Sequence, residues 1–337
     1  MSSVYIIAEA GVNHNGDVGM ALRLVEEARA AGADCVKFQT FRAERIVTAV
    51  SPKANYQLEV TDRAESQFDM LKKLELGRDD FARIKAHCAR VGIQFMSTPY
   101  DPEDAELLHA LGVDAFKIAS GQVVELPFLR QVARYGKRMI VSTGMADMAE
   151  VREAVHAIRS TGNTDLIVLQ CNTDYPSRIE DANLRAMLTM RDTLKVRVGY
   201  SDHVPENLVC FAAVALGAEV IEKHFTLDRA LPGPDHSSSL EPAGLRALVQ
   251  GIRDVERSLG DGVKQPGERE RANTYGMRRS LVAARDLKAG TVLSAADLGS
   301  KRPANGLSPK HLDEVVGVRL KRDLCRDEAL TLDHLDR

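Results

Sequence analysis

Two histidines end two successive apolar stretches of the chain, and this placement suits metal-assisted chemistry. His203 follows the run at residues 196–200, and His224 follows the run at residues 220–222. If the two runs are neighbouring strands, both imidazoles lie on one rim, where they suit a divalent ion with open positions. The carboxylates nearby favour a harder ion such as manganese over zinc. A single histidine could equally cap its strand by hydrogen bonding, but the repeated position favours a ligand pair.

The residues after His224 form a loop that brings more chemistry to the same place. The sequence LPGPDH at residues 231–236 cannot continue a strand or a helix, because its two prolines flank a glycine. It delivers Asp235 close behind the histidine. We therefore expect a functional site where these strands end.

Composition limits the class of protein. The chain has 337 residues, 44% of them hydrophobic, which is enough for one large and one small domain. Its net charge of -3 does not suit binding to nucleic acid or to an anionic membrane. We find no apolar run long enough to span a bilayer and no signal-peptide pattern, which predicts a cytoplasmic protein. The five cysteines are scattered and lack a CxxC spacing. We interpret them as small buried hydrophobic residues in a reducing compartment.

Short β-rich runs alternate with amphipathic helical runs over about 260 residues. Eight such units have the size and rhythm of a TIM (β/α)8 barrel of the α/β class. The expected strands cover residues 4–8, 35–39, 93–97, 115–119, 139–142, 166–170, 196–199 and 220–222. The expected helices cover residues 17–31, 78–91, 102–111, 127–135, 148–160, 179–193, 206–216 and 242–259.

The predicted domains are a barrel at residues 1–260, a linker at 261–277 and a small domain at 278–337. The linker is rich in Gly, Lys, Glu and Arg. One long polar insert, residues 43–76, follows the second strand, and inserts over a barrel mouth usually line or close the site.

Polar residues follow most of the expected strands, and in a parallel barrel these strand ends carry the chemistry. Lysines and hydroxyl groups that converge from several strands would hold a phosphorylated anion without a Walker loop. Each lysine alone could instead form a salt bridge with a neighbouring carboxylate, but two inward lysines on strands are unusual. The anion-binding candidates are Lys37, Lys117, Ser120, Ser142 and Ser201, and the first strand adds Glu9, Asn13 and His14 to the rim.

Eight motifs carry a resemblance to the sialic acid synthase family. They are, in order, IAEAGVNHNG, VKFQT, STPYD, FKIASG, STGM, GYSDH, EKHFT and PGPDH. Members of the family condense phosphoenolpyruvate with an N-acetylated mannose-type sugar to give a nine-carbon nonulosonic acid. The terminal region with KRPANG is similar to the small antifreeze-like (SAF, β-clip) domain of these synthases. The insert sequences YQLE and ESQFDMLKKLEL resemble bacterial legionaminic acid synthases more than N-acetylneuraminate synthases.

The resemblance implies a role for each motif residue. His203 and His224 would hold a divalent ion, manganese with magnesium or cobalt as alternatives, which polarises the aldehyde oxygen of the open-chain sugar. Glu9 would be the acid/base or water-orienting carboxylate, and Lys117 and Gln122 would also belong to the catalytic set. The residues that match the phosphoenolpyruvate site are Lys37, Thr98, Lys117, Ser120, Ser142 and Ser201. Those that match the sugar site are Gln39, Thr173, Tyr175, Asp235 and, on the small domain, Arg302.

In the family the small domain reaches over the barrel of the other subunit, so the resemblance implies a domain-swapped homodimer. The sequence departs from the family pattern in two motifs. Gln122 stands where the SGE motif commonly has glutamate, and an amide cannot carry a proton, so a general-base role would fall to Glu9 or to water. Asn172 and Thr173 differ in order from the N-acetylneuraminate synthases.

The expected function is synthesis of N,N'-diacetyllegionaminic acid from 2,4-diacetamido-2,4,6-trideoxymannose, with N-acetylneuraminate or pseudaminic acid synthesis as alternatives. Three other classes compete. A 3-deoxy sugar acid synthase would need a second phosphate site, for which the rim offers no spare basic cluster. A Schiff-base aldolase would use Lys37 or Lys117. A carbohydrate- or ice-binding protein on an inactive barrel predicts lost metal ligands, yet both histidines are present.

Overall fold

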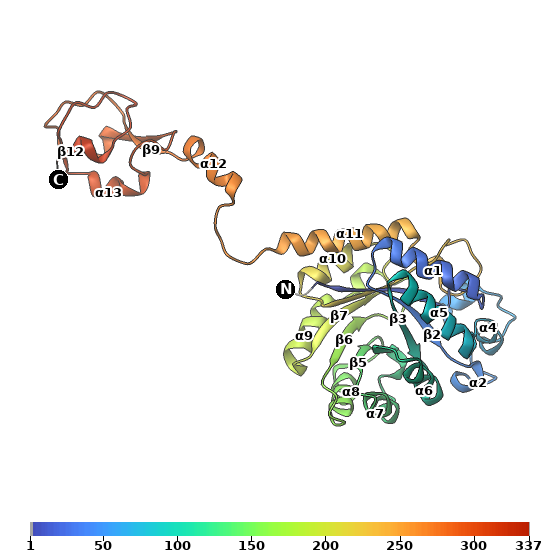
Figure 1. Ribbon diagram of the computed structural model, residues 1–337. Coiled ribbons are helices and arrows are strands. Elements are labelled where there is room, and N and C mark those ends of the chain that lie inside the picture. Colours follow the sequence, from blue (N-terminus) through green and yellow to red (C-terminus); the bar gives the residue numbers. More distant parts are fainter. Residues whose placement is uncertain (1–2, 337) are drawn as a thin grey trace. The chain divides into compact units, whose positions relative to one another are not determined.

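The computed structural model describes residues 3–336, and the chain divides into two compact units, Met1–Gly260 and Asp261–Arg337. The first unit is built on eight strands that pair in parallel in the order β3-β2-β1-β8-β7-β6-β5-β4. Residues of β3 and β4 lie close together, so the sheet curves round to a nearly closed barrel (Figure 1). The strands are β1 Tyr5–Gly11, β2 Cys35–Thr40, β3 Gln94–Pro99, β4 Ala115–Ile118, β5 Arg138–Ser142, β6 Leu166–Cys171, β7 Arg197–Asp202 and β8 Val220–His224.

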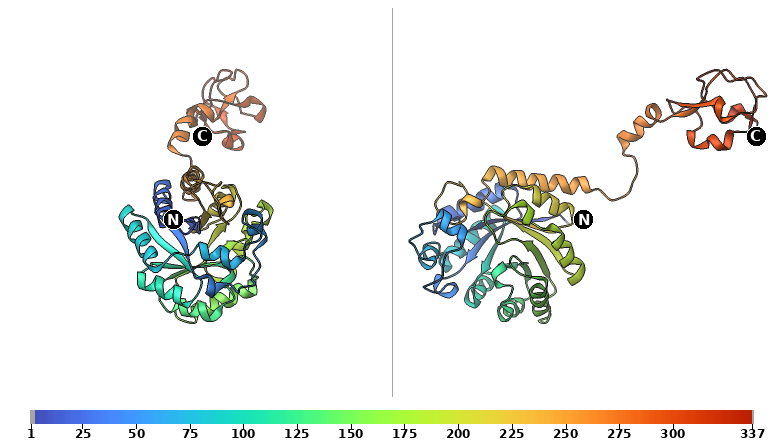
Figure 2. Two further views of the ribbon diagram at one scale, coloured as in Figure 1. Left: turned by 90° about the vertical axis from the view of Figure 1, so that its right-hand side faces the viewer. Right: turned by 180° about the vertical axis from the view of Figure 1, so that it is seen from behind.

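Helices surround this barrel on its outer side, as Figures 1 and 2 show. They begin and end where the sequence provides caps: the Asp17 carboxylate accepts a hydrogen bond from the Gly19 amide before α1, and Gly32 ends that helix in a left-handed conformation. The predicted TIM barrel is therefore confirmed. The barrel helices are α1 Val18–Ala31, α5 Arg78–Val91, α6 Pro102–Leu111, α7 Leu126–Ala133, α8 Met148–Arg159, α9 Leu184–Leu194, α10 Leu208–Ala215 and α11 Pro242–Leu259.

The inner face of the barrel changes from apolar to polar along the strands. Side chains alternate between the two faces of a strand, so residues two apart share a face. An apolar cluster at the start of the strands includes Ile7 and Cys35, and the next inward residues are Glu9 and Lys37. The same step leads from Val220 to Glu222 on β8. The barrel floor is thus closed by hydrophobic packing, and buried charge collects at the carboxyl ends.

The predicted insert after β2 forms three short helices, α2 Ala43–Ile46, α3 Asn55–Val60 and α4 Gln67–Lys73. A small hydrophobic cluster of Phe41, Leu74 and Val12 packs with Ile46, Leu71 and Tyr100 and anchors the insert to the barrel. Within the insert, the buried Lys53 ammonium donates to the Thr61 hydroxyl at 3.0 Å and to the Glu65 carboxylate at 3.0 Å. The insert is therefore an ordered cover built on one side of the barrel mouth.

The second unit has its own apolar core, which includes Leu281, Leu293, Leu320 and Leu330. The segment predicted as a linker contains α12, where the Glu270 carboxylate accepts from the Gly267 amide and acidic residues occupy the first turn. The elements of this unit are α12 Glu268–Met277, β9 Ser280–Ala283, β10 Leu298–Lys301, α13 Leu312–Val315, β11 Arg319–Leu320 and β12 Leu335–Asp336.

Two expectations from composition can be compared with the structure. The cysteines were expected to be buried, and four of them are, but Cys325 is exposed on the second unit, so that expectation is wrong for it. Within residues 3–336, no helix has both the length and the apolar character that a bilayer crossing requires.

Candidate active site

A cavity of about 640 Å³ lies at the carboxyl ends of the barrel strands. It brings together most of the predicted barrel residues, and Asp235 lines an adjoining cavity. The predicted residues that line the larger cavity are Glu9, Lys37, Gln39, Thr98, Lys117, Ser120, Gln122, Ser142, Thr173, Tyr175, Ser201, His203 and His224. They come from all eight strands or the loops that follow them.

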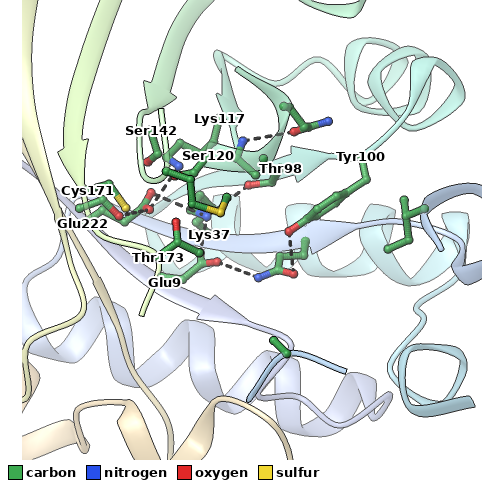
Figure 3. Close-up of a pocket in the computed structure, with 18 of the residues that line it drawn as sticks. Glu9, Lys37, Thr98, Tyr100, Lys117, Ser120, Ser142, Cys171, Thr173 and Glu222 are labelled. Atoms are coloured by element: carbon green, nitrogen blue, oxygen red, sulfur yellow. Dashed lines mark hydrogen bonds and ion pairs between the residues drawn. The ribbon is translucent and has the colours of Figure 1, made fainter. Parts of the chain in front are cut away.

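Two buried lysines and two buried glutamates form the centre of this cavity (Figure 3). The Lys37 ammonium lies 2.8 Å from the Glu9 carboxylate and 3.7 Å from that of Glu222. The Lys117 ammonium lies 3.3 Å from Glu222, which also accepts a hydrogen bond from the Ser201 hydroxyl at 2.9 Å. Each lysine therefore does form a salt bridge with a neighbouring carboxylate, which was the alternative to anion binding. Both lysines line the cavity, and Lys117, whose other partner is the Ile118 carbonyl at 3.2 Å, keeps one of its three donors for a ligand.

The two carboxylates have different pKa values because their surroundings differ. Burial raises the pKa of Glu9 to about 7, against the opposing effect of Lys37. Burial acts on Glu222 in the same direction, but Lys117 and Lys37 together lower its pKa to about 2. Burial lowers the pKa of Lys117, whereas the Glu222 and Glu9 carboxylates outweigh burial at Lys37 and raise its pKa. Glu222 is thus ionised at neutral pH, whereas the pKa of Glu9 lies near neutral pH, so that Glu9 can gain or lose a proton there.

Hydroxyl groups surround the lysines. The Lys37 ammonium donates to the Thr98 hydroxyl at 3.2 Å, and the Ser120 hydroxyl accepts from the Gly144 amide at 2.9 Å. Ser142 is buried, and its oxygen has no hydrogen-bond partner among the described residues. A buried hydroxyl without a partner is costly, so its placement on the cavity wall indicates a ligand that completes it.

The two histidines lie together beside Tyr175. Their ring centroids are 5.4 Å apart, and the Tyr175 ring is 4.0 Å from that of His203 and 5.7 Å from that of His224. His203 Nδ1 contacts the carbonyl oxygen of Asn172, which favours the tautomer with the proton on Nδ1. Burial, with His203 as the next cause, lowers the pKa of His224 well below its usual value, so its imidazole is neutral.

Gln39 and Asp235 stand beside this pair. Gln39 donates to the Glu9 carboxylate at 3.4 Å and accepts from the Tyr100 hydroxyl at 3.2 Å. The Asp235 carboxylate lies 3.9 Å from His224 Nδ1, and burial raises its pKa to about 6. The loop predicted after β8 therefore does deliver Asp235 to the histidine.

Gln122 has a local structural role that its sequence position did not reveal. Its side-chain oxygen accepts from the Ala119 amide at 3.2 Å, and its side-chain nitrogen donates to the Pro99 carbonyl at 3.1 Å. The amide thus joins the end of β3 to the turn after β4 while lining the cavity. A glutamate here could make the first bond but not the second.

Some predicted positions lie elsewhere. Asn13 donates to the Phe225 carbonyl at 2.9 Å, and His14 is fully buried with Nδ1 accepting from the Gly16 amide at 3.0 Å, so both are structural and outside the cavity lining. The prediction that they face the site from the rim is therefore wrong, because the turn after β1 directs both side chains back into the protein. Arg302 belongs to the second unit, where it is exposed and donates to the Met277 carbonyl at 3.0 Å.

The expected site omitted two residues that the structure places at its centre. Glu222 pairs with both lysines, and Tyr100 bonds Gln39. The strand alternation could have indicated Glu222, because it occupies the same inward step as Lys37 on its own strand. Tyr100 follows the last residue of β3 and carried no comparable signal.

The fold and this cavity define a TIM-barrel enzyme with a small C-terminal accessory domain. Comparison with known proteins identifies the family: the NeuB family profile matches residues 24–264, and the SAF domain profile matches residues 278–336. The chain belongs to the NeuB family, and the resemblance seen in the sequence is confirmed.

Several relatives cover nearly the whole chain. The N,N'-diacetyllegionaminic acid synthase of Campylobacter jejuni is 43% identical over 98% of this chain and 99% of its own length. The enzyme of the same name from Legionella pneumophila is 43% identical, over 98% of this chain and 94% of its own. A solved structure of the N-acetylneuraminic acid synthetase of Leptospira borgpetersenii has a TM-score of 0.71 and 34% identity, and the match covers 81% of this chain and 90% of that one.

Proposed function

We propose that this protein condenses phosphoenolpyruvate with 2,4-diacetamido-2,4,6-trideoxymannose, giving N,N'-diacetyllegionaminic acid and inorganic phosphate. The observation that carries the proposal is the pair of buried lysines, Lys37 and Lys117, in the same cavity as the two histidines. An anion and an aldehyde can thus meet in one enclosed space. The whole-length similarity to two relatives named for this product supports the choice of sugar.

The lysine side of the cavity is proposed to bind phosphoenolpyruvate. Its carboxylate and phosphate need several donors, and Lys37 and Lys117 supply ammonium groups. The Ser142 hydroxyl, which has no hydrogen-bond partner among the described residues, would gain one from the ligand. The remaining proposed contacts are Thr98, Ser120 and Ser201. Glu222 keeps the two lysines in place through its ion pairs.

The histidine pair fits a divalent ion in part. The buried His224 Nδ1 has no hydrogen-bond partner among the described residues, and the His203 tautomer leaves Nε2 with its lone pair. Within residues 3–336, however, no group of three or more His, Cys, Asp or Glu side chains is arranged as a metal cage. We propose that His203 and His224 hold the ion, manganese being favoured, with water and substrate as further ligands. Such an ion acts as a Lewis acid toward an aldehyde oxygen.

The reaction forms one carbon–carbon bond and one carbon–oxygen bond, and it breaks one carbon–oxygen bond. The electron pair of the phosphoenolpyruvate double bond moves from carbon 3 to the aldehyde carbon, whose oxygen takes up a proton. Water adds at carbon 2 and loses a proton, and phosphate then leaves with the former bridging oxygen while the new hydroxyl group gives its proton to phosphate or water and becomes the ketone. Glu9, which lies in the cavity beside Lys37, is proposed to hold or orient this water. Gln122 carries no proton in this scheme because it is an amide.

The histidine side of the cavity is proposed to bind the sugar. Gln39, Thr173, Tyr175 and Asp235 offer an amide, two hydroxyl groups and a carboxylate to its hydroxyl and amide groups. We propose that Arg302 of a partner subunit completes the site in a domain-swapped homodimer.

The test is phosphate release from phosphoenolpyruvate with manganese, offered N-acetylmannosamine and 2,4-diacetamido-2,4,6-trideoxymannose in parallel. We expect a strong preference for the diacetamido sugar. A preference for N-acetylmannosamine would make the protein an N-acetylneuraminate synthase, and activity with neither would contradict the proposed reaction. Borohydride trapping with pyruvate should leave Lys37 and Lys117 unmodified, which separates this reaction from a Schiff-base aldolase.

A further inference from the structure

A second cavity of about 300 Å³ adjoins the proposed active site on its histidine side. It lies where the insert helices meet the barrel mouth, and the two cavities share wall residues. The shared residues are Gln39, Ile46, Gln57, Gln67, Tyr100, Tyr175 and His224. A ligand held at His224 can therefore extend from one space into the other.

The walls of this side cavity combine apolar side chains with carboxamides. The apolar part is drawn largely from the cluster that anchors the insert, with Phe41, Ile46 and Leu71 as members. Val12 belongs to the same cluster, and the other apolar wall residues are Val47, Met70 and Pro234. The polar part is formed by Gln39, Gln57, Gln67 and Asp235. Lysine and arginine are absent from its lining among the described residues, so this space does not suit a phosphate.

Gln57 and Gln67 differ in how firmly they are held. The Gln57 side-chain oxygen accepts from the Ala54 amide at 3.0 Å, which fixes it as part of the turn that begins α3. The Gln67 nitrogen donates to the same oxygen at 3.4 Å, and the Gln67 oxygen makes no hydrogen bond among the described residues. Gln67 is therefore oriented by its nitrogen and presents an acceptor in a wall shared by both cavities.

We infer that this side cavity binds the second N-acyl group of the sugar and the methyl group beside it, with Gln67 accepting from the acylamino N–H. The inference rests on the proposed function, because the lysine side is then taken by phosphoenolpyruvate and the sugar extends from His224 toward the insert. An acetyl methyl group and a deoxy methyl group suit the apolar wall. A sugar with hydroxyl groups at these positions would bury them against Ile46 and Leu71 without partners, which the site rejects.

The experiment compares two sugars on the full-length protein and its variants. Gln67→Leu removes the acceptor at nearly constant volume, and Ile46→Phe fills the apolar end. For each variant, kcat/KM is measured with 2,4-diacetamido-2,4,6-trideoxymannose and with N-acetylmannosamine, together with the KM for phosphoenolpyruvate. Gln250→Leu, on the exposed face of α11, is the matched control.

We expect the selectivity for the diacetamido sugar to fall roughly tenfold or more in both variants. Gln67→Leu loses the hydrogen bond to the acylamino group, and Ile46→Phe fills the space that the methyl groups would occupy. The KM for phosphoenolpyruvate should stay unchanged, as should the selectivity of Gln250→Leu. Equal losses with both sugars, or no change, would overturn the inference and leave the proposed reaction intact. A wild-type protein that releases phosphate with neither sugar would overturn the proposed function itself.

Discussion

At the scale of single residues, the wall of the cavity leaves no room beside Gly144. A Cβ atom built there would lie 2.2 Å from the Thr173 hydroxyl and 2.9 Å from the Ser120 hydroxyl. Gly144 also donates its amide to Ser120. The glycine therefore lets two strand-end loops approach closely enough for both hydroxyl groups to face the cavity.

We predict that Gly144→Ala displaces both hydroxyl groups and raises the KM for phosphoenolpyruvate at least about tenfold, the cost of roughly one lost charge-assisted hydrogen bond. Steady-state kinetics in both substrates measures this. Gly276→Ala is the control, because a Cβ at Gly276 meets no atom of the described residues within 4 Å. An unchanged KM for phosphoenolpyruvate in Gly144→Ala would show that Ser120 does not contact that substrate, and an unchanged KM for the sugar would show the same of Thr173.

Most of the cavity residues could be predicted from the sequence, for a simple geometric reason. A parallel barrel brings all strand ends to one rim, so Lys37, Lys117 and Ser142 had to meet once the strands were located. The sequence could not show how they pair, because the ion pairs with Glu222 depend on the closing of the barrel. The bonds of Gln122 and the inward turn of His14 also depend on loop geometry that spacing does not determine.

At the scale of elements, a buried ion pair joins the two strands that carry the histidines. The Lys223 ammonium lies 2.5 Å from the Asp202 carboxylate, and both side chains are almost fully buried. The ammonium also donates to the Glu206 carbonyl at 3.0 Å. Asp202 and Lys223 are paired residues of β7 and β8, and each precedes a histidine. Their ion pair on the outer face of the barrel therefore helps to fix the register of the two strands.

We predict that Lys223→Met lowers the free energy of unfolding by about 3–5 kcal/mol, because it leaves Asp202 buried without its partner. Denaturant unfolding followed by circular dichroism measures this. The double variant Asp202→Asn/Lys223→Met should recover part of the loss, since no unpaired charge remains. Lys73→Met, which removes an exposed partner of Glu65, should change the stability little. Equal effects of Lys223→Met and Lys73→Met would contradict this account.

Two buried histidines lie in the loops after β1 and β8. The His236 imidazole bonds the Thr226 hydroxyl at 2.7 Å and the Asn15 side chain at 3.2 Å, and His14 accepts from the Gly16 amide. Burial lowers the pKa of both histidines to about 4. The native structure therefore holds both rings neutral at pH values where an unfolded chain protonates them.

We predict that these histidines destabilise the barrel as the pH falls from about 6.5 to about 4. In that window the unfolded chain binds protons that the native state does not, so each histidine costs about 1.4 kcal/mol per pH unit. Their contribution is fully present above pH 6.5. Unfolding of wild type and of His14→Gln across this range isolates one histidine. A stability difference between the two proteins that is independent of pH would contradict the depressed pKa.

The insert shows the limit of prediction for elements. Its polar composition predicted a segment over the barrel mouth, and it does line both cavities through Ile46, Gln57 and Gln67. Its three short helices could not be expected from periodicity, because α2 and α3 are too short for a hydrophobic face to repeat. They are stabilised by specific bonds such as those of Lys53.

At the scale of the whole molecule, the chain consists of two compact units with separate cores. The barrel unit carries the lysines and histidines, and the second unit carries Arg302. The proposed swapped homodimer would build each site from the barrel of one subunit and the small domain of the other. Sequence alone suggested this arrangement only through the family resemblance, because no residue pattern within one chain encodes a partner.

A mixture of two defective subunits tests the swap. We expect His224→Ala homodimers to be nearly inactive and Arg302→Ala homodimers to be slow at sugar concentrations below the wild-type KM. In a swapped mixed dimer, one site combines the intact barrel of one subunit with the intact small domain of the other, and the second site carries both defects. Equal co-expression makes half of the dimers mixed, so roughly a quarter of the wild-type activity should return.

Without a swap, each subunit of the mixed dimer retains its own defect and the activity stays at the average of the two parents. Co-expression of Arg302→Ala with the double variant His224→Ala/Arg302→Ala is the matched control, because that mixture contains no intact small domain. Recovery in the first mixture but not in the control would require that Arg302 acts on the barrel of its partner. An Arg302→Ala homodimer with wild-type kinetics would instead remove Arg302 from the site and leave the lysine and histidine cavity to bind both substrates alone.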